Sequence, residues 1–135
     1  NFLKMVSVLK VLLPSLKKSP HTPCVVLFSS VVIQKGMPFH SLVGSSKGAI
    51  EGFVKNMAVE YAPKIRFNCI APSLTNTPLA KSITSNPKML ETSISKHPLK
   101  RIGEPEDIGK LVSYLLLEDS FMTGQIFHPD GGMSV

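Results

Sequence analysis

One stretch of the sequence, Cys24-Val25-Val26-Leu27-Phe28-Ser29, decides the fold class. Its first five residues are apolar, several of them β-branched or aromatic, and no polar residue alternates with them. A strand that is apolar on both faces belongs inside a parallel sheet with helices covering each side. The stretch therefore predicts an α/β fold.

Long amphipathic helices are predicted on either side of this strand. Apolar residues at helical spacing predict one helix over residues 2–16. The two prolines within residues 17–23 stop it. Residues 34–38 are predicted as a loop, after which steps of three and four residues predict a second helix over 41–61, ended by Pro63.

Three glycines spaced four apart line one stripe of the second helix: Gly44, Gly48 and Gly52. Glycine weakens a helix, so a compensating contact is expected there. We predict that this stripe lets another backbone come close. The apolar stripe of the same helix is predicted to be core or subunit contact, and its members are Leu42, Ile50, Phe53 and Met57.

The remaining sequence continues the alternation of strands and helices. The predicted elements are, in order, a strand at 65–71, short helical stretches near 79–83 and 87–94, a helix that starts at 104–107 and a strand at 125–128. Residues 104–107 start a helix because they place proline and acidic residues in its first turn. Strands that alternate with helices take right-handed connections, so three parallel strands are expected.

Composition favours a globular protein. The 135 residues are 43% hydrophobic and 18% charged, which is enough for one modest core. No apolar run reaches the roughly eighteen residues of a membrane span, so no membrane partner is expected. Cys24 and Cys69 lie in apolar runs without metal or disulfide spacing, which favours inert core thiols and a reducing, cytoplasmic location.

The formal net charge of +6 raises the question of nucleic-acid binding. The basic residues are scattered as pairs such as Lys17-Lys18 and Lys100-Arg101, without a basic stripe or interleaved aromatic residues. We therefore expect no nucleic-acid partner. A true nucleic-acid binder would show steep salt dependence.

Five segments, in this order and spacing, resemble the short-chain dehydrogenase/reductase family. They are Val25–Ser30, Ser45–Gly52, Arg66–Pro72, Pro98–Ile108 and Thr123–Gly132, the last containing Asp130-Gly131-Gly132. The resemblance covers essentially all 135 residues. It implies the carboxyl-terminal half of a Rossmann-type, doubly wound parallel sheet, so residues 1–135 are expected to be a single partial domain.

The resemblance implies catalytic roles for three residues. Ser30 lies thirteen residues before position 43, as the family's serine lies before its tyrosine, and Lys47 lies four after it. Asn1 lies thirteen residues before Pro14, which matches the family's asparagine. A loop-capping serine and a solvated surface lysine are the ordinary alternatives for Ser30 and Lys47.

The resemblance also implies a nicotinamide cofactor, NAD or NADP. Lys47 would contact the nicotinamide ribose, and the segment 72–77 would contact the nicotinamide end. The expected contacts in that segment are Pro72, Ser73, Thr75 and Thr77, with Ser73 standing where glycine is usual. The family's glycine-rich phosphate turn does not occur in these residues, so tight cofactor binding by this chain alone is not expected.

Val43 stands where the family keeps its catalytic tyrosine. The tyrosine exchanges a proton with the substrate oxygen, and a lysine four residues on shares its helix face and lowers its pKa. Valine has no such proton, and losing a general acid typically costs roughly 10²–10⁴ in rate. His40, three residues before Val43, is a candidate replacement acid, with an ordinary loop histidine as the alternative.

Two functions remain open from the sequence. The favoured one is an NAD(P)-dependent oxidoreductase acting on a small-molecule carbonyl/alcohol pair, present as a fragment that is inactive alone. Its irregular stretch 79–96 would form a substrate lid. The alternative is a catalytically inactive binding or assembly module, and the resemblance implies a homo-oligomer, dimer or tetramer, in either case.

Overall fold

The computed structural model describes residues 2–118 and 120–135, and it contains one parallel sheet in the order β1-β2-β3. These strands are β1 (Cys24–Phe28), β2 (Arg66–Ile70) and β3 (Ile126–Phe127). β1 pairs with β2 from Cys24↔Arg66 to Phe28↔Ile70, and β3 pairs with the last two residues of β2. The predicted α/β class and its three parallel strands are confirmed.

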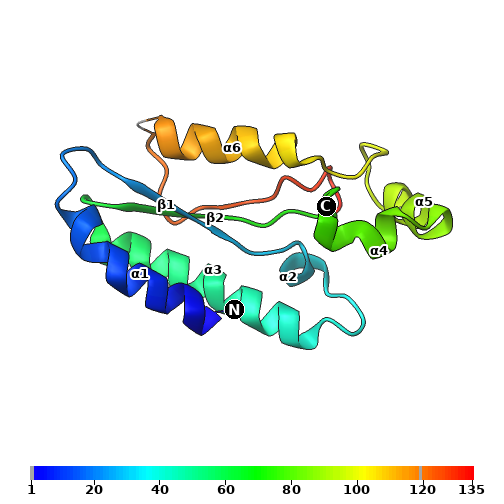
Figure 1. Ribbon diagram of the computed structural model, residues 1–135, viewed down its shortest axis with the longest axis horizontal. Helices are drawn as coiled ribbons and strands as arrows, with labels where there is room; N and C mark the ends of the chain where they lie inside the picture. Colours follow the sequence, from blue (N-terminus) through cyan, green and yellow to red (C-terminus); the bar gives the residue numbers. More distant parts are fainter. Residues whose placement is uncertain (1, 119) are drawn as a thin grey trace.

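Helices cover both faces of the sheet (Figure 1). On one face lie α1 (Phe2–Lys17) and α3 (Ser41–Tyr61), and on the other lies α6 (Pro105–Leu117). The central strand β2 is buried along its whole length. Phe67 and Cys69 pack toward α3, whereas Ile70 packs with α6 through Ile108 and Leu115, which explains why the strands are apolar on both faces.

The short helix α2 (Val32–Lys35) occupies part of the region where a loop was predicted. Four helical residues are too few to leave a periodic signal in the sequence. The helix packs on the glycine stripe of α3: a Cβ on Gly44 would lie 3.6 Å from Val32 Cγ1, and one on Gly48 would lie 3.8 Å from Ile33 Cδ1. Gly44 and Gly48 therefore receive side chains of α2 and not another backbone, and a Cβ on Gly52 would meet no described atom within 4 Å, which corrects that prediction.

The apolar stripe predicted on α3 divides between core and surface. Ile50 and Met57 are buried in the core, and Phe53 packs against it. Leu42 is 86% exposed and belongs to the surface. The stripe is thus core over most of its length.

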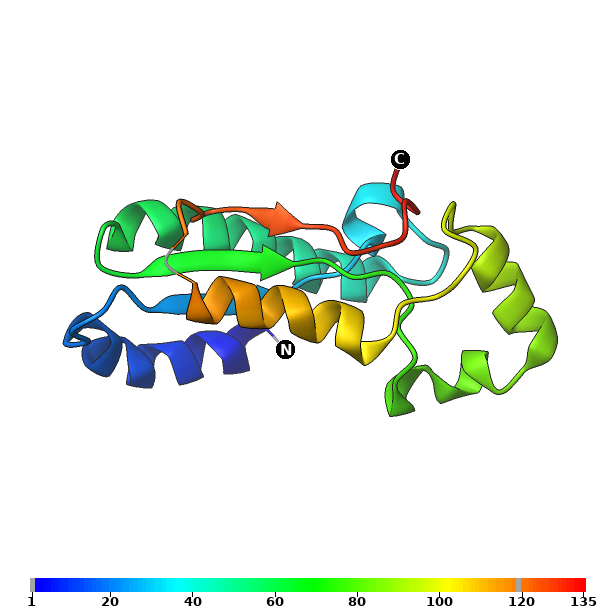
Figure 2. The same cartoon turned by 90° about the horizontal axis from the view of Figure 1, so that it is seen from above.

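The irregular segment lies beyond the carboxyl ends of the strands (Figure 2). It consists of η1 (Pro78–Ala80), α4 (Lys81–Thr84) and α5 (Pro87–Ser95), none of which contains a buried residue. Pro87 begins α5 behind Asn86, whose side chain accepts a hydrogen bond from the Met89 amide. The two short helical stretches predicted in the sequence are confirmed.

Arg66 holds the far end of α6 onto the sheet. Its guanidinium, in a side chain that is only 8% exposed, donates to the carbonyl oxygens of Leu115 at 3.1 Å and Glu118 at 3.0 Å, and to Ser120 Oγ at 3.0 Å. These carbonyls belong to the last turn of α6, where backbone acceptors lack partners within the helix and a cation is favoured. Arg66 therefore acts as a C-terminal cap supplied by another element.

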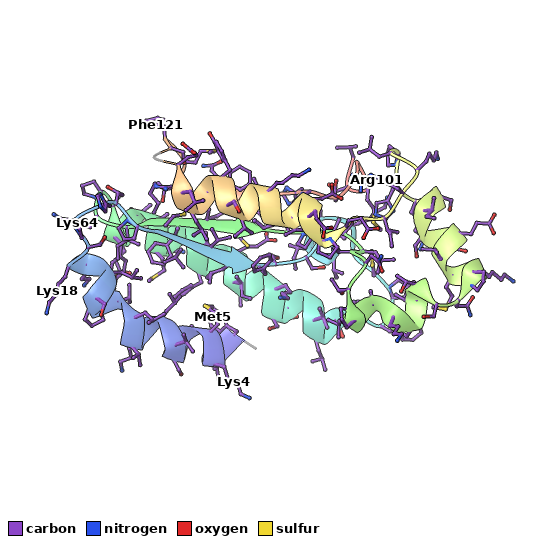
Figure 3. All side chains as sticks on the ribbon, turned by 45° about the horizontal axis from the view of Figure 1, so that its top comes forward. Lys4, Met5, Lys18, Lys64, Arg101 and Phe121 are labelled. Atoms are coloured by element: carbon purple, nitrogen blue, oxygen red, sulfur yellow. The ribbon has the colours of Figure 1, made fainter. Side chains whose placement is uncertain are left out.

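The labelled basic residues lie at more than one part of the molecule. Lys18 and Lys64 lie at the same end, whereas Lys4 extends from the first turn of α1 and Arg101 lies elsewhere, before α6 (Figure 3). Among the described residues, no helix has the length and apolar character needed to cross a membrane.

Candidate active site

The ends of β1 and β2 bring two chain segments together at one edge of the sheet. The amide of Ser29 donates to the Ile70 carbonyl at 2.8 Å, and the amide of Val31 donates to the Pro72 carbonyl at 3.0 Å. The pairing of the strands thus continues past their formal ends. It places Ser30 beside the segment that begins at Pro72.

A cavity of about 870 Å³ opens at this edge. Seven of the residues singled out in the sequence line it, namely Ser30, His40, Val43, Pro72, Ser73, Thr75 and Thr77. The predicted lid contributes Leu79, Ala80, Ile83, Ser93 and Lys96. Most of the other lining side chains are apolar. Ligand sites in open parallel sheets form at this position, outside the carboxyl ends of the strands.

Lys47 extends from α3 to the end of β1. Its Nζ donates to the Phe28 carbonyl oxygen at 2.9 Å, and Phe28 also lines the cavity. Ser30, two residues further on, accepts from the Val32 amide at 3.4 Å, which is a long and weak contact. The Ser30 hydroxyl therefore keeps its proton for another partner, and both functional groups lie at the same edge of the sheet.

A buried serine–carboxylate pair lies behind this edge and was not anticipated from the sequence. Ser29 Oγ donates to Glu51 Oε1 at 2.6 Å, and both residues are more than nine-tenths buried. Glu51 follows Lys47 by one helical turn on α3. Burial first of all, together with the nearby Glu51 carboxylate, raises the pKa of the Cys69 thiol to about 11.

Val43 occupies the wall of the cavity and is 47% exposed. His40, at the N-cap of α3, is also exposed and lines the same cavity. Its Nδ1 lies 2.7 Å from the Pro38 carbonyl oxygen, which can only accept, so Nδ1 carries a proton. The structure thus places His40 within the cavity without showing a proton-transfer partner for it.

His97 is a second histidine at the cavity, and sequence reasoning missed it. Its side chain is 1% exposed, with Nδ1 2.7 Å from the Ser93 carbonyl oxygen and Nε2 2.8 Å from Ser73 Oγ. A smaller cavity of about 200 Å³ is also lined by Ser73 and His97. No local signal marks His97, because its partner Ser73 is 24 residues away in the sequence.

An ion pair borders the smaller cavity at the start of α6. Arg101 Nη1 lies 2.6 Å from Asp107 Oδ2, and the same oxygen accepts from the Glu104 amide at 2.8 Å. The hydrogen bond from Arg101 lowers the pKa of Asp107 to about 2. Glu104 and Asp107 form the capping box that confirms the helix start predicted from the sequence.

The cavity suits the nicotinamide end of a dinucleotide better than a metal. Its lining offers several neutral hydroxyls, among them Thr75 and Thr77, at the end of two parallel strands, and the Lys47 amine lies nearby on the carbonyl oxygen of the lining residue Phe28. Within the part of the chain that the structure describes, no cluster of His, Cys, Asp and Glu could hold a metal ion. Asn1, the remaining catalytic candidate, lies outside the described residues.

Comparisons with known proteins agree with this architecture. A profile of the family described as Enoyl-(Acyl carrier protein) reductase matches residues 1–134. A tropinone reductase homolog from Datura stramonium is 39% identical over 127 residues, which are 90% of this chain and 47% of that protein.

Solved structures of related proteins also have this fold. The ligand-free aldohexose dehydrogenase of Thermoplasma acidophilum superposes with a TM-score of 0.86 at 32% identity, over 93% of this chain and 53% of that one. The RhlG/NADP active-site complex of Pseudomonas aeruginosa gives 0.87 at 28% identity, over 97% and 54%. The chain spans about half the length of the curated relatives it matches. With its parallel sheet, its cavity and these matches, the chain belongs to the short-chain dehydrogenase/reductase family.

Proposed function

We propose that the cavity at the ends of β1 and β2 is the substrate end of an NAD(P)-dependent oxidoreductase acting on a carbonyl/alcohol pair. The observation that carries the proposal is the convergence of Ser30, Lys47 and the segment 72–77 on one edge of the sheet. The NADP complex of the related RhlG supports the choice of cofactor class. The mostly apolar lining favours a substrate whose carbonyl sits on an apolar skeleton.

Each residue then has a chemical task. The Ser30 hydroxyl donates a hydrogen bond to the substrate carbonyl oxygen and stabilises the negative charge that develops there. Lys47 holds the nicotinamide ribose and supplies positive charge beside it. Pro72, Ser73, Thr75 and Thr77 shape the nicotinamide end. When bound, the cofactor supplies the hydride that the protein's own side chains cannot provide.

The segment 79–96 acts as the substrate lid in this proposal. It carries no buried residue in η1, α4 or α5, yet Leu79 and Ile83 line the cavity. Segments with few buried contacts open at low free-energy cost, as a lid must. The proposal includes a cytoplasmic location. It also includes little activity for these 135 residues alone, because they contain no glycine-rich phosphate-binding turn.

A second function is an inactive member of the family that serves as a binding or assembly module. Val43 favours the inactive module, because the cavity wall carries valine where the family has the tyrosine that acts as its acid. Apolar side chains exposed along α1 also favour it, and they include Leu3, Val8, Val11 and Leu12. In both functions, this face is where a homodimer or homotetramer would form.

Titration with NADPH and an apolar ketone distinguishes the two functions. The longest expressible form of the protein is used, with binding followed by nicotinamide fluorescence and oxidation by absorbance. Binding with hydride transfer supports the oxidoreductase, and binding without turnover supports the module. No binding at all contradicts both.

A further inference from the structure

The buried imidazole of His97 has no task in the function proposed above. A buried polar ring is costly unless its nitrogens are hydrogen-bonded, and both are. One partner is a main-chain carbonyl, but the other is the hydroxyl of Ser73, which lines the cavity. The ring is thus linked to the surface where a substrate would sit.

The Ser93 carbonyl fixes the state of the ring. A carbonyl oxygen only accepts, so the 2.7 Å contact requires a proton on Nδ1 of His97. In the neutral ring Nε2 is then an acceptor, and Ser73 Oγ donates to it across 2.8 Å. A hydroxyl bonded to an imidazole whose other nitrogen is fixed by a third group is the general arrangement for proton transfer in enzymes.

Ser73 lines the same cavity as Val43, the residue that stands in place of the family's tyrosine. Ser30 follows β1 and Ser73 follows β2, and the Val31–Pro72 hydrogen bond keeps these two strand ends adjacent. Both serines line the cavity that Val43 also lines. Ser30 and Ser73 therefore follow neighbouring strand ends and line the same cavity.

We propose that Ser73 exchanges the proton with the substrate oxygen, and that His97 exchanges it with Ser73, in place of the phenol absent at position 43. This inference rests on the oxidoreductase function proposed above. In the reducing direction, a hydride supplied by a reduced nicotinamide cofactor would reach the carbonyl carbon, and the carbonyl oxygen would take the Ser73 proton. Ser73 Oγ takes the Nε2 proton of an initially cationic His97, which ends neutral. In the oxidising direction every transfer is reversed.

The charged groups around this pair come from three segments. Lys96 precedes His97 and lines the larger cavity, while Arg101 and Asp107 line the smaller cavity and pair with each other. The carboxylate of Asp107 is therefore already occupied. Among the described residues, Ser73 is the one group bonded to Nε2 of His97, so the proton has a defined route to the cavity.

The test uses the chain itself, labelled with ¹⁵N, and benzamide, whose carbonyl accepts hydrogen bonds but is not reduced. Long-range imidazole spectra are expected to show the His97 proton on Nδ1 at pH 8. Benzamide is expected to shift the Nε2 resonance of His97, which a merely structural histidine would not show. Ser73→Ala is expected to weaken benzamide binding roughly three- to tenfold, the loss of one hydrogen bond.

Two control variants isolate the pair. Ser95→Ala changes an exposed residue outside the cavity lining and loses only a hydroxyl bonded to the Thr92 carbonyl, so benzamide binding is expected to be unchanged. His21→Gln, at an exposed histidine outside the cavity lining, is likewise expected to leave it unchanged. The proposal is overturned if the proton resides on Nε2, if Ser73→Ala binds benzamide as tightly as the unaltered chain, or if the unaltered chain does not bind it. The NADPH titration reports on the oxidoreductase function separately, because no nicotinamide is present in the benzamide experiment.

Discussion

Replacing Arg66 with methionine removes the cap that β2 supplies to α6. Methionine keeps much of the length of the side chain but cannot donate. The carbonyl oxygens of Leu115 and Glu118, now bonded at 3.1 and 3.0 Å, would lose their charged donor next to the buried core. A buried acceptor left without a partner carries its full desolvation penalty.

The expected loss follows from these contacts. Hydrogen bonds to a charged group contribute about 1.5–3 kcal/mol each, and a cation at a helix C-terminus contributes up to about 2 kcal/mol. Burying the guanidinium opposes them, since its Nε has no partner among the described residues. We expect Arg66→Met to lower the free energy of unfolding by about 2–4 kcal/mol.

Urea unfolding followed by circular dichroism measures this loss. Lys64→Met, an exposed change two residues away, serves as the control and is expected to shift the free energy of unfolding by less than about 0.5 kcal/mol. A loss below about 1 kcal/mol for Arg66→Met, with an unchanged denaturant slope, would refute the capping role. Such a small loss would mean that water hydrogen-bonds the Leu115 and Glu118 carbonyl oxygens as favourably as Arg66 does.

Two further predictions concern titratable groups. The pKa of Cys69 is raised to about 11, and burial raises the pKa of Cys24. Both thiols should therefore react with Ellman's reagent at pH 8 far more slowly in the folded chain than in urea. Equal rates would contradict their burial. The pKa of Asp107 is lowered to about 2, so its contribution to stability is fully present above its ordinary value near 4 and disappears as the pH falls through 2. Asp107→Asn should therefore be less stable than the unaltered chain at pH 6, with the gap closing toward pH 2; a gap independent of pH would point to packing instead.

Local patterns predicted most of the architecture. The strand at Cys24–Ser29 and the helix at 41–61 follow from periodicity, which depends only on neighbours in the sequence. The start of α6 follows from Glu104 and Asp107, which bond within a single turn. Ser30 and the segment 72–77 were chosen from the family resemblance, and adjacent parallel strands bring them to one edge of the sheet.

Contacts between distant segments could not be predicted in the same way. Ser29 meets Glu51, Ser73 meets His97, and Arg66 meets α6, across 22, 24 and at least 49 residues. Each pairing depends on which face of an element turns inward at that point. A buried histidine and a buried arginine carry no mark of their burial in the surrounding sequence.

The central claim is that the edge formed by β1 and β2 recognises the nicotinamide end of a dinucleotide. Nicotinamide mononucleotide tests it on the chain as it stands, since this probe lacks the adenosine part of a dinucleotide, for which these 135 residues contain no glycine-rich turn. Amide spectra should show weak, saturable shifts confined to residues around Ser30, Lys47 and 72–77, reduced in Lys47→Met but not in Lys55→Met. Shifts that are absent, or that fall on the opposite edge of the sheet, would contradict the claim.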